Sequence, residues 1–174
     1  EPVRFGGALD DLTSARAAVP APLLRKDFLV APIQLLEARA HGASAVLLIA
    51  RALPPAQLRD LALEAVALGL TPLIEVRTTP ELSTALAVPQ AVIGVNNRDL
   101  ETLVIDPSVG ARLIPLVPPD RVAVYESGVQ STADVERAAA AGADAVLVGS
   151  VLSVAADPVA AVTALAGVPR RARG

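Results

Sequence analysis

Short apolar runs alternate with longer stretches of helical period along nearly the whole chain, and no other feature of the sequence restricts the fold as much. The runs, rich in Val, Ile and Leu, occupy residues 23–28, 45–50, 72–76, 91–96, 122–127 and 145–150. Between them, apolar residues recur at helical spacing, as in residues 58–68 and 135–139. Strands that begin every ~20 to 30 residues and alternate with helices predict βα units and a parallel sheet.

The apolar runs lack the alternation of polar and apolar residues that is typical of a strand with one solvent-exposed face. Each strand is therefore expected to be buried on both sides, which fits a doubly wound sheet and a closed barrel equally well. Six such units, with residues 1–7 taken as the exit of an earlier strand, would be about two strands short of an eight-stranded barrel.

Composition removes several classes of function. The chain of 174 residues has no cysteine and a single histidine, His41, so disulfides, thiolate sites and histidine clusters for zinc are excluded. A net charge of −3 and an aromatic content of 2% argue against nucleic-acid binding. No apolar run is long enough to cross a bilayer, and the start lacks the pattern of a signal peptide, so we expect a cytoplasmic protein without membrane contact.

Four of the apolar runs carry, toward their ends, polar residues suited to acid–base chemistry. Lys26 belongs to the first run, Glu75 to the third, Asn96 to the fourth and Glu126 to the fifth. Because ligands bind at the carboxyl ends of parallel strands, these side chains are candidates for a common active site. Carboxylates in such places suit general base work or the stabilisation of a cationic intermediate.

Lys26 and Asn96 also have purely structural interpretations. Strand alternation would direct Lys26 into the mouth of a barrel, buried between apolar neighbours. An ion pair with Asp27 or Glu75 explains the same lysine equally well. Likewise, Asn96 and Asn97 can form an Asx-turn that leads the chain out of its strand.

Small residues follow the last two apolar runs. Ser127 and Gly128 come after Glu126, and Gly149 and Ser150 close the final run, where a short helix can begin at Ser150. Backbone amides and a helix N-terminus after the final strands of a barrel bind phosphate with little net charge. These residues therefore predict a phosphate site.

With these residues in place, the chain resembles the indole-3-glycerol phosphate synthase family over nearly its whole length. Four motifs carry the resemblance, in order and at matching spacing: LRKDF at 24–28, LIEV at 73–76, GVNNRDL at 94–100 and ESGV at 126–129. The resemblance implies a (β/α)8 TIM barrel of the phosphate-binding type and a carboxy-lyase of tryptophan biosynthesis that needs no cofactor and no metal. The implied reaction closes the ring of 1-(2-carboxyphenylamino)-1-deoxyribulose 5-phosphate, with loss of carbon dioxide and water, to give indole-3-glycerol phosphate.

The same resemblance assigns a role to individual residues. It implies that Lys26 is the general acid and Glu75 the general base, while Asn96 and Glu126 position the substrate. The implied phosphate and rim contacts are Arg98, Ser127, Gly128, Gly149 and Ser150, and the implied apolar pocket for the aromatic ring consists of Phe28, Leu47, Leu100 and Leu147.

Part of the family pattern has no counterpart in this sequence. The missing parts are the first barrel strand, which carries another catalytic lysine and a carboxylate, and an N-terminal helical extension. We therefore expect a partial barrel over residues 1–167, from the exit of strand 2 through helix 8 and lacking roughly the first two strands. Residues 168–174 are expected to form a disordered basic tail, and the chain alone is expected to be poorly active.

Two other functions fit some of these residues. A different phosphate-binding barrel, such as phosphoribosylanthranilate isomerase or an aldolase-like lyase, would use a carboxylate with another acid or a Schiff-base lysine. The four motifs in order argue against that class. A non-catalytic pseudoenzyme that keeps only the ligand pocket would bind the substrate without turnover.

An incomplete barrel would expose apolar sheet edges, and exposed edges pair readily with other chains. We therefore predict that the isolated chain self-associates or is poorly soluble. Sedimentation velocity measures the distribution of species directly, and a monodisperse monomer would contradict this prediction.

Overall fold

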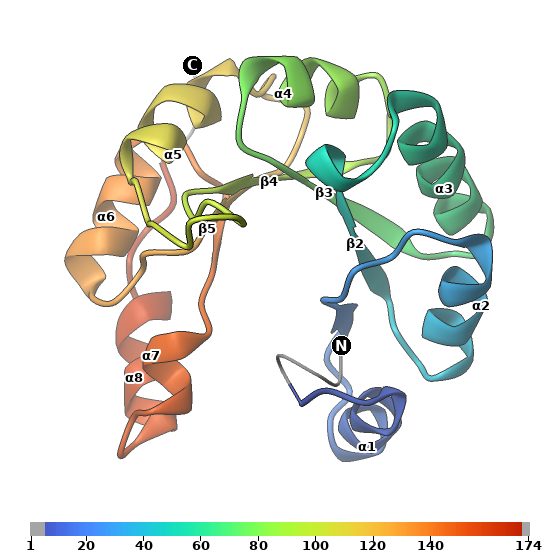
Figure 1. The fold of residues 1–174 in the computed structure, drawn as a ribbon. Helices are drawn as coiled ribbons and strands as arrows, with labels where there is room; N and C mark the ends of the chain where they lie inside the picture. Colours follow the sequence, from blue (N-terminus) through green and yellow to red (C-terminus); the bar gives the residue numbers. More distant parts are fainter. Residues whose placement is uncertain (1–5, 172–174) are drawn as a thin grey trace. The chain divides into compact units, whose positions relative to one another are not determined.

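Two compact units make up the part of the chain that the computed structural model describes, residues 6–171 (Figure 1). Among these residues, the first unit consists of 6–75 and 83–92, and the second of 76–82 and 93–171. In each unit, parallel strands neighbour one another in chain order, with helices between them. The predicted succession of βα units is therefore confirmed.

The first unit contains the elements from α1 to β3. They are α1 (Leu9–Ala18), β1 (Leu24–Arg25), α2 (Pro32–Ala40), β2 (Ala45–Ile49), the 3-10 helix η1 (Ala50–Ala52), α3 (Pro55–Ala67) and β3 (Thr71–Val76). Proline opens both α2 and α3, at the position where its missing N–H costs no hydrogen bond. The next helix, α4 (Thr79–Leu86), begins in the second unit and ends in the first.

Register sorts the strand residues of the first unit onto two faces, because successive side chains of a strand point to opposite sides. Arg25 and Val46 are register partners on the face that meets α2, and Val46 has no exposed surface. Ile49 and Glu75 are register partners on the opposite face. This sorting places the Glu75 carboxylate away from α2.

The second unit contains the elements from β4 onward. They are β4 (Val92–Asn96), α5 (Ser108–Leu113), the 3-10 helix η2 (Ile114–Leu116), β5 (Ala123–Glu126), α6 (Thr132–Ala140), β6 (Ala145–Leu147), α7 (Ser150–Ser153) and α8 (Pro158–Ala166). Asn96, Glu126 and Leu147 are aligned across β4, β5 and β6 and share one face. Tyr125 lies on the other face and packs against Gly110 of α5.

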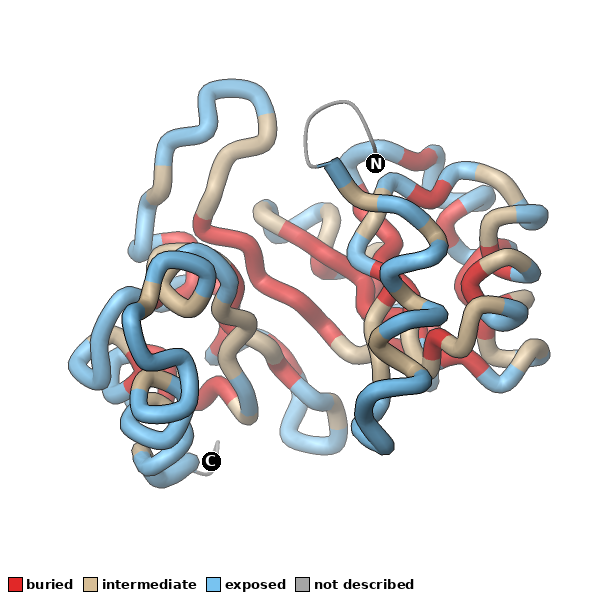
Figure 2. Tube along the Cα trace, turned by 90° about the horizontal axis from the view of Figure 1, so that it is seen from below, coloured by how far each residue is buried: buried red, intermediate tan, exposed pale blue. Residues whose placement is uncertain are grey.

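Burial follows the strands and the inner faces of the helices (Figure 2). The predicted apolar stripes are buried on α3, at Leu58, Leu61, Ala62 and Ala65, and on α6, at Val135, Ala138 and Ala139. Leu68, the last residue of the predicted stripe in 58–68, follows α3 as its C-cap and is half-buried. Among the described α-helices, α1, α7 and α8 bury none of their residues. None of the helices described between residues 6 and 171 is long and apolar enough to cross a membrane.

The first predicted strand is the one that departs most from expectation. Residues 23–28 were expected to form a strand, but β1 contains only Leu24 and Arg25, so Lys26 and Phe28 lie beyond its end. The physical reason is local, because the Asp27 side chain accepts a hydrogen bond from the Phe28 N–H at 2.9 Å, and a backbone amide bonded in this way is not available to a neighbouring strand.

The last predicted strand is also shorter than residues 145–150, since β6 ends at Leu147. The chain then turns at Gly149, and α7 begins at Ser150. The predicted helix start at Ser150 is therefore confirmed, and it explains the early end of the strand.

Two predictions fall partly on residues outside the described part of the chain. Residues 1–5, which belong to the expected exit of an earlier strand, lie outside it, and so do residues 172–174 of the expected tail. Within the tail region that the structure describes, Arg170 forms an ion pair with Asp144 at 3.2 Å.

Replacement of Gly110 by alanine is expected to destabilise the second unit. A Cβ at this position would lie 2.7 Å from Cδ2 of Tyr125 and 2.9 Å from Oδ1 of Asn97, inside van der Waals contact. Because overpacking a core costs roughly 1 to 3 kcal/mol, urea unfolding should show a loss of that size in the free energy of unfolding. Gly149→Ala is the control, since nothing lies within 4 Å of its added Cβ. Equal stability of the two variants would contradict the packing described.

Candidate functional site

Lys26 and Glu75 meet in the first unit. Nζ of Lys26 lies 3.6 Å from Oε2 of Glu75; the lysine side chain is 44% exposed and the glutamate side chain 5% exposed. The predicted burial of Lys26 between apolar neighbours is therefore wrong, because β1 ends before this residue. The alternative contact with Glu75 is confirmed, and it joins an accessible ammonium to a sheltered carboxylate.

A cleft of about 430 Å³ adjoins Lys26. Its walls are the first turn of α1 with the residues just before it, and residues 24–27. A ligand in this cleft would lie next to the ammonium, a group with three hydrogen-bond donors. Throughout residues 6–171, no group of three or more His, Asp or Glu side chains is placed to hold a metal ion.

Two apolar residues expected to contact the substrate ring differ in their surroundings. Leu47 is 3% exposed and shares the face of Glu75, because its register partner lies two residues before that glutamate. Phe28 is 42% exposed and lies beyond the end of β1. Leu47 is thus part of the wall beside the carboxylate, whereas Phe28 presents its ring to the surroundings.

Asn96 and Glu126 are brought together in the second unit. They are register partners at the ends of β4 and β5, with 5% and 1% of their surface exposed, and Leu147 is aligned with Glu126 on β6. Oδ1 of Asn96 accepts a hydrogen bond from the Arg98 N–H at 2.9 Å. The predicted Asx-turn is therefore confirmed at Asn96, while the residue still shares its face with Glu126.

Asn97 lies on the opposite face from Asn96 and is fully buried. Its Nδ2 donates to the carbonyls of Glu126 at 2.8 Å and Ser127 at 3.2 Å, and its Oδ1 accepts from the Gly110 N–H at 2.8 Å. Burial raises the pKa of the Tyr125 phenol, which packs beside this amide and stays neutral. Asn97 thus ties the ends of β4 and β5 to α5.

The loop after β4 carries Arg98, a predicted rim contact, and Leu100, a predicted residue of the apolar pocket. Arg98 forms an isolated antiparallel bridge with Ile105, and its guanidinium donates to a carbonyl of the same loop at 3.2 Å. Asp99 pairs with Arg77 at 3.3 Å, and Leu100 is half-buried at the turn. The loop is therefore held by its own hydrogen bonds and by one ion pair.

The turn after β5 is distinguished by its left-handed backbone. Ser127 and Gly128 have φ angles of 64° and 81°, two left-handed residues in succession. A Cβ at residue 128 would lie 2.9 Å from Cγ2 of Ile105, so glycine is required there for both backbone and space.

The second glycine turn follows the neighbouring strand. Gly149 precedes α7, and it and Ser150 are both exposed. Because β5 and β6 are paired, the two predicted phosphate turns leave adjacent strands of the same unit. The structure thus groups Ser127, Gly128, Gly149 and Ser150 at one end of this pair of strands.

Sequence reasoning missed the buried polar residues on the helix-facing sides. Arg25 and Asn97 are among the buried polar residues of their units. Arg25 was assigned no role, and Asn97 only a place in an Asx-turn. The sequence could have indicated that these two residues face a helix. Each is adjacent to a candidate site residue, and adjacent residues of a strand point to opposite faces. A charged or amide group facing a helix needs partners there.

Comparison with known proteins shows which family this arrangement belongs with. The model of the family described as indole-3-glycerol phosphate synthase matches residues 1–165. The indole-3-glycerol phosphate synthase of Mycolicibacterium smegmatis is 51% identical over 162 residues, which are 93% of this chain and 60% of that protein. The protein of the same name from Nocardioides sp. is 52% identical over 165 residues, 95% of this chain and 64% of that protein. The chain thus spans about 60% of the length of the curated relatives it matches.

A solved structure supports the fold class. The 3-hexulose-6-phosphate synthase of Salmonella typhimurium matches with a TM-score of 0.79 over 96% of this chain and 81% of that chain, at 16% sequence identity. A likeness at such low identity shows the fold alone. Together with the parallel strands in chain order, it confirms the predicted α/β fold of the TIM-barrel class.

The Asn97 contacts lead to a stability prediction. Asn97→Leu removes three hydrogen bonds and leaves buried carbonyl and N–H groups without this partner, so the free energy of unfolding should fall by roughly 2 to 4 kcal/mol. Urea unfolding followed by circular dichroism measures it. The exposed Gln130, changed to leucine in the same way, serves as the control. A loss no larger than that of the control would contradict the role assigned to Asn97.

Proposed function

Because this chain belongs to the indole-3-glycerol phosphate synthase family, we propose that the protein is a carboxy-lyase of tryptophan biosynthesis. Its proposed substrate is 1-(2-carboxyphenylamino)-1-deoxyribulose 5-phosphate, and its proposed product is indole-3-glycerol phosphate. The observation that carries the proposal is the contact of Lys26 with the sheltered carboxylate of Glu75.

The composition of the chain strengthens this interpretation of Lys26. The sequence contains 15 Lys and Arg residues together, and Lys26 is the only lysine among them. A structural ion pair with Glu75 could be made by arginine, which the chain uses everywhere else. An ammonium, unlike a guanidinium, can give up a proton within a protein, so general acid work requires lysine at this position.

The proposed chemistry divides between the two partners. Lys26 donates a proton to the carbonyl oxygen as the aromatic ring attacks. After taking up a proton from the solvent, it donates again to the hydroxyl that leaves as water. After carbon dioxide has departed, Glu75 accepts the proton whose removal completes the indole ring. A base that is 5% exposed is kept from competing water, whereas an acid that is 44% exposed can reach a ligand.

Binding is proposed to rest on the other residues. Asn96 and Glu126 lie beside one another at the ends of β4 and β5, where a carboxylate and an amide can position the substrate. The two left-handed residues at 127 and 128 and the start of α7 at Ser150 support a phosphate site, with Arg98 at its rim. Leu47, Leu147, Leu100 and Phe28 are the proposed apolar contacts of the aromatic ring.

The decisive experiment compares two replacements of Lys26 in an indole-fluorescence turnover assay. The assay uses the 174-residue chain and a chimera in which the unmatched part of the Mycolicibacterium smegmatis relative is joined to it. Lys26→Ala and Lys26→Arg are both expected to lower kcat by roughly 10²- to 10⁴-fold, the size of a general acid contribution. Arg39→Ala, an exposed change on α2, should leave kcat unchanged.

The arginine variant separates a catalytic lysine from a structural one. Lys26→Arg retains a cation for Glu75 but supplies no transferable proton. If Lys26→Arg keeps full turnover, the general acid role is wrong. Substrate binding without turnover in the unmodified chimera would overturn the proposed activity itself.

A further inference from the structure

The backbone around Lys26 is held by a buried arginine. Arg25 is 7% exposed, and its Nη1 donates to the Gln34 carbonyl at 2.6 Å and to Oε2 of Glu37 at 3.1 Å. Its Nη2 donates to Oδ2 of Asp27 at 3.3 Å. One guanidinium thus joins α2 to residues on both sides of Lys26.

The residues after Lys26 are fixed by the same network. Oδ1 of Asp27 accepts from the Phe28 N–H at 2.9 Å. The Gln34 side chain donates to the Phe28 carbonyl at 3.0 Å and accepts from the N–H groups of Val30 at 2.7 Å and Ala31 at 3.0 Å. The segment that leaves β1 is therefore bonded to side chains at residues 28, 30 and 31, although it pairs with no strand among residues 6–171.

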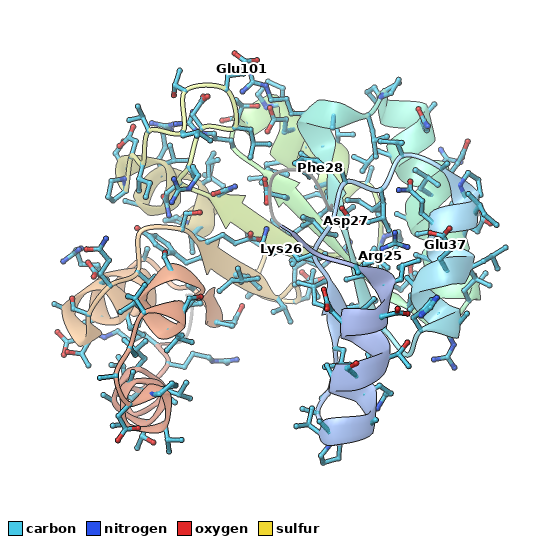
Figure 3. All side chains as sticks on the ribbon, turned by 60° about the horizontal axis from the view of Figure 1, so that its bottom comes forward. Arg25, Lys26, Asp27, Phe28, Glu37 and Glu101 are labelled. Atoms are coloured by element: carbon cyan, nitrogen blue, oxygen red, sulfur yellow. The ribbon has the colours of Figure 1, made fainter. Side chains whose placement is uncertain are left out.

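Arg25 and Lys26 point in different directions, as expected for adjacent residues at the end of a strand (Figure 3). In this view Arg25 lies on the side of α2 and Glu37, and Lys26 lies on the other side of the chain. The arginine therefore cannot act on a ligand beside Lys26 directly. Any influence must pass through Asp27 and the backbone.

We propose that Arg25 is a positioning residue, which holds the Lys26 ammonium at its place beside Glu75 through the ion pair with Asp27 and the bonds to α2. The effect on turnover rests on the proposed function, but the effect on the placement of Lys26 does not. A guanidinium suits this task because its planar fork serves three acceptors at once, which an ammonium on a flexible stem does not do in a fixed geometry.

A merely structural arginine is the competing explanation, and it predicts a different result. If Arg25 only ties β1 to α2, its loss lowers stability, while Lys26 in the folded protein keeps its contact with Glu75. If Arg25 positions Lys26, its loss changes the surroundings of the lysine even in molecules that remain folded.

The test measures the reactivity of Lys26, which is the only lysine of the chain and so gives a single acylated lysine. The 174-residue chain is acylated with limiting acetic anhydride, with N-acetyl-lysine amide as internal standard. Arg25→Met and Asp27→Asn should raise the acylation rate of Lys26 by roughly two- to fivefold, the factor that a part-exposed ion pair represents. Glu75→Gln gives the rate without the carboxylate, and Arg39→Met, exposed on α2, should match the parent chain.

Turnover is then measured on the chimera with the same changes. Arg25→Met and Asp27→Asn should lower kcat by roughly 10- to 100-fold with little change in KM, as a displaced catalytic group would. If acylation rises while turnover is kept, the positioning role stands and the catalytic role of Lys26 fails. If acylation in folded Arg25→Met equals that of the parent chain, the positioning role is wrong; should that variant not fold, Asp27→Asn decides by the same criterion.

Discussion

The alternation of side chains along parallel strands is the constraint on which the candidate sites depend. Within the first unit it sends Arg25 toward α2 and leaves Glu75 on the opposite face. Within the second it sends Asn97 toward α5 and keeps Asn96 beside Glu126. Because adjacent residues must face opposite sides, a polar pair at a strand end supplies one group for chemistry and one for support.

Burying the supporting side chains, Arg25 and Asn97, removes their polar atoms from water. This costs free energy unless hydrogen bonds within the protein replace those to water. Asn97 uses both ends of its amide, bonding two carbonyls and one N–H. Arg25 bonds two carboxylates and a carbonyl through its two terminal nitrogens, while its buried Nε has no hydrogen-bond partner among the described residues. In both cases the bonds reach from a strand end to the helix packed on it, so the stability of the unit and the placement of the neighbouring side chain depend on the same contacts.

The sequence predicted those features that follow from period and spacing. Strand positions, the buried stripes of α3 and α6 and the helix start at Ser150 all follow from local pattern. It failed for residues 26–28, because the apolar run continues through Phe28 while side chains of Asp27 and Gln34 take the backbone bonds that a longer strand would use. Period alone does not report such competition, and for the same reason the burial of Lys26 was wrong. Alternation predicts the face on which Arg25 and Asn97 lie, but not the groups that they bond, because most of those groups lie 9 to 30 residues away in sequence.

The exposure of Lys26, which contradicts its predicted burial, also bears on its proposed role. A lysine sealed among apolar neighbours would lose contact with a ligand, and a fully solvated one would have no defined position. Lys26 is 44% exposed, so a ligand can reach it. Its ammonium lies 3.6 Å from the nearly buried carboxylate of Glu75, which gives it a defined position. Access results from the early end of β1, where backbone N–H groups donate to the side chains of Asp27 and Gln34 instead of to a neighbouring strand. The same few side chains that shorten β1 therefore leave Lys26, just beyond its end, at a place that a ligand can reach.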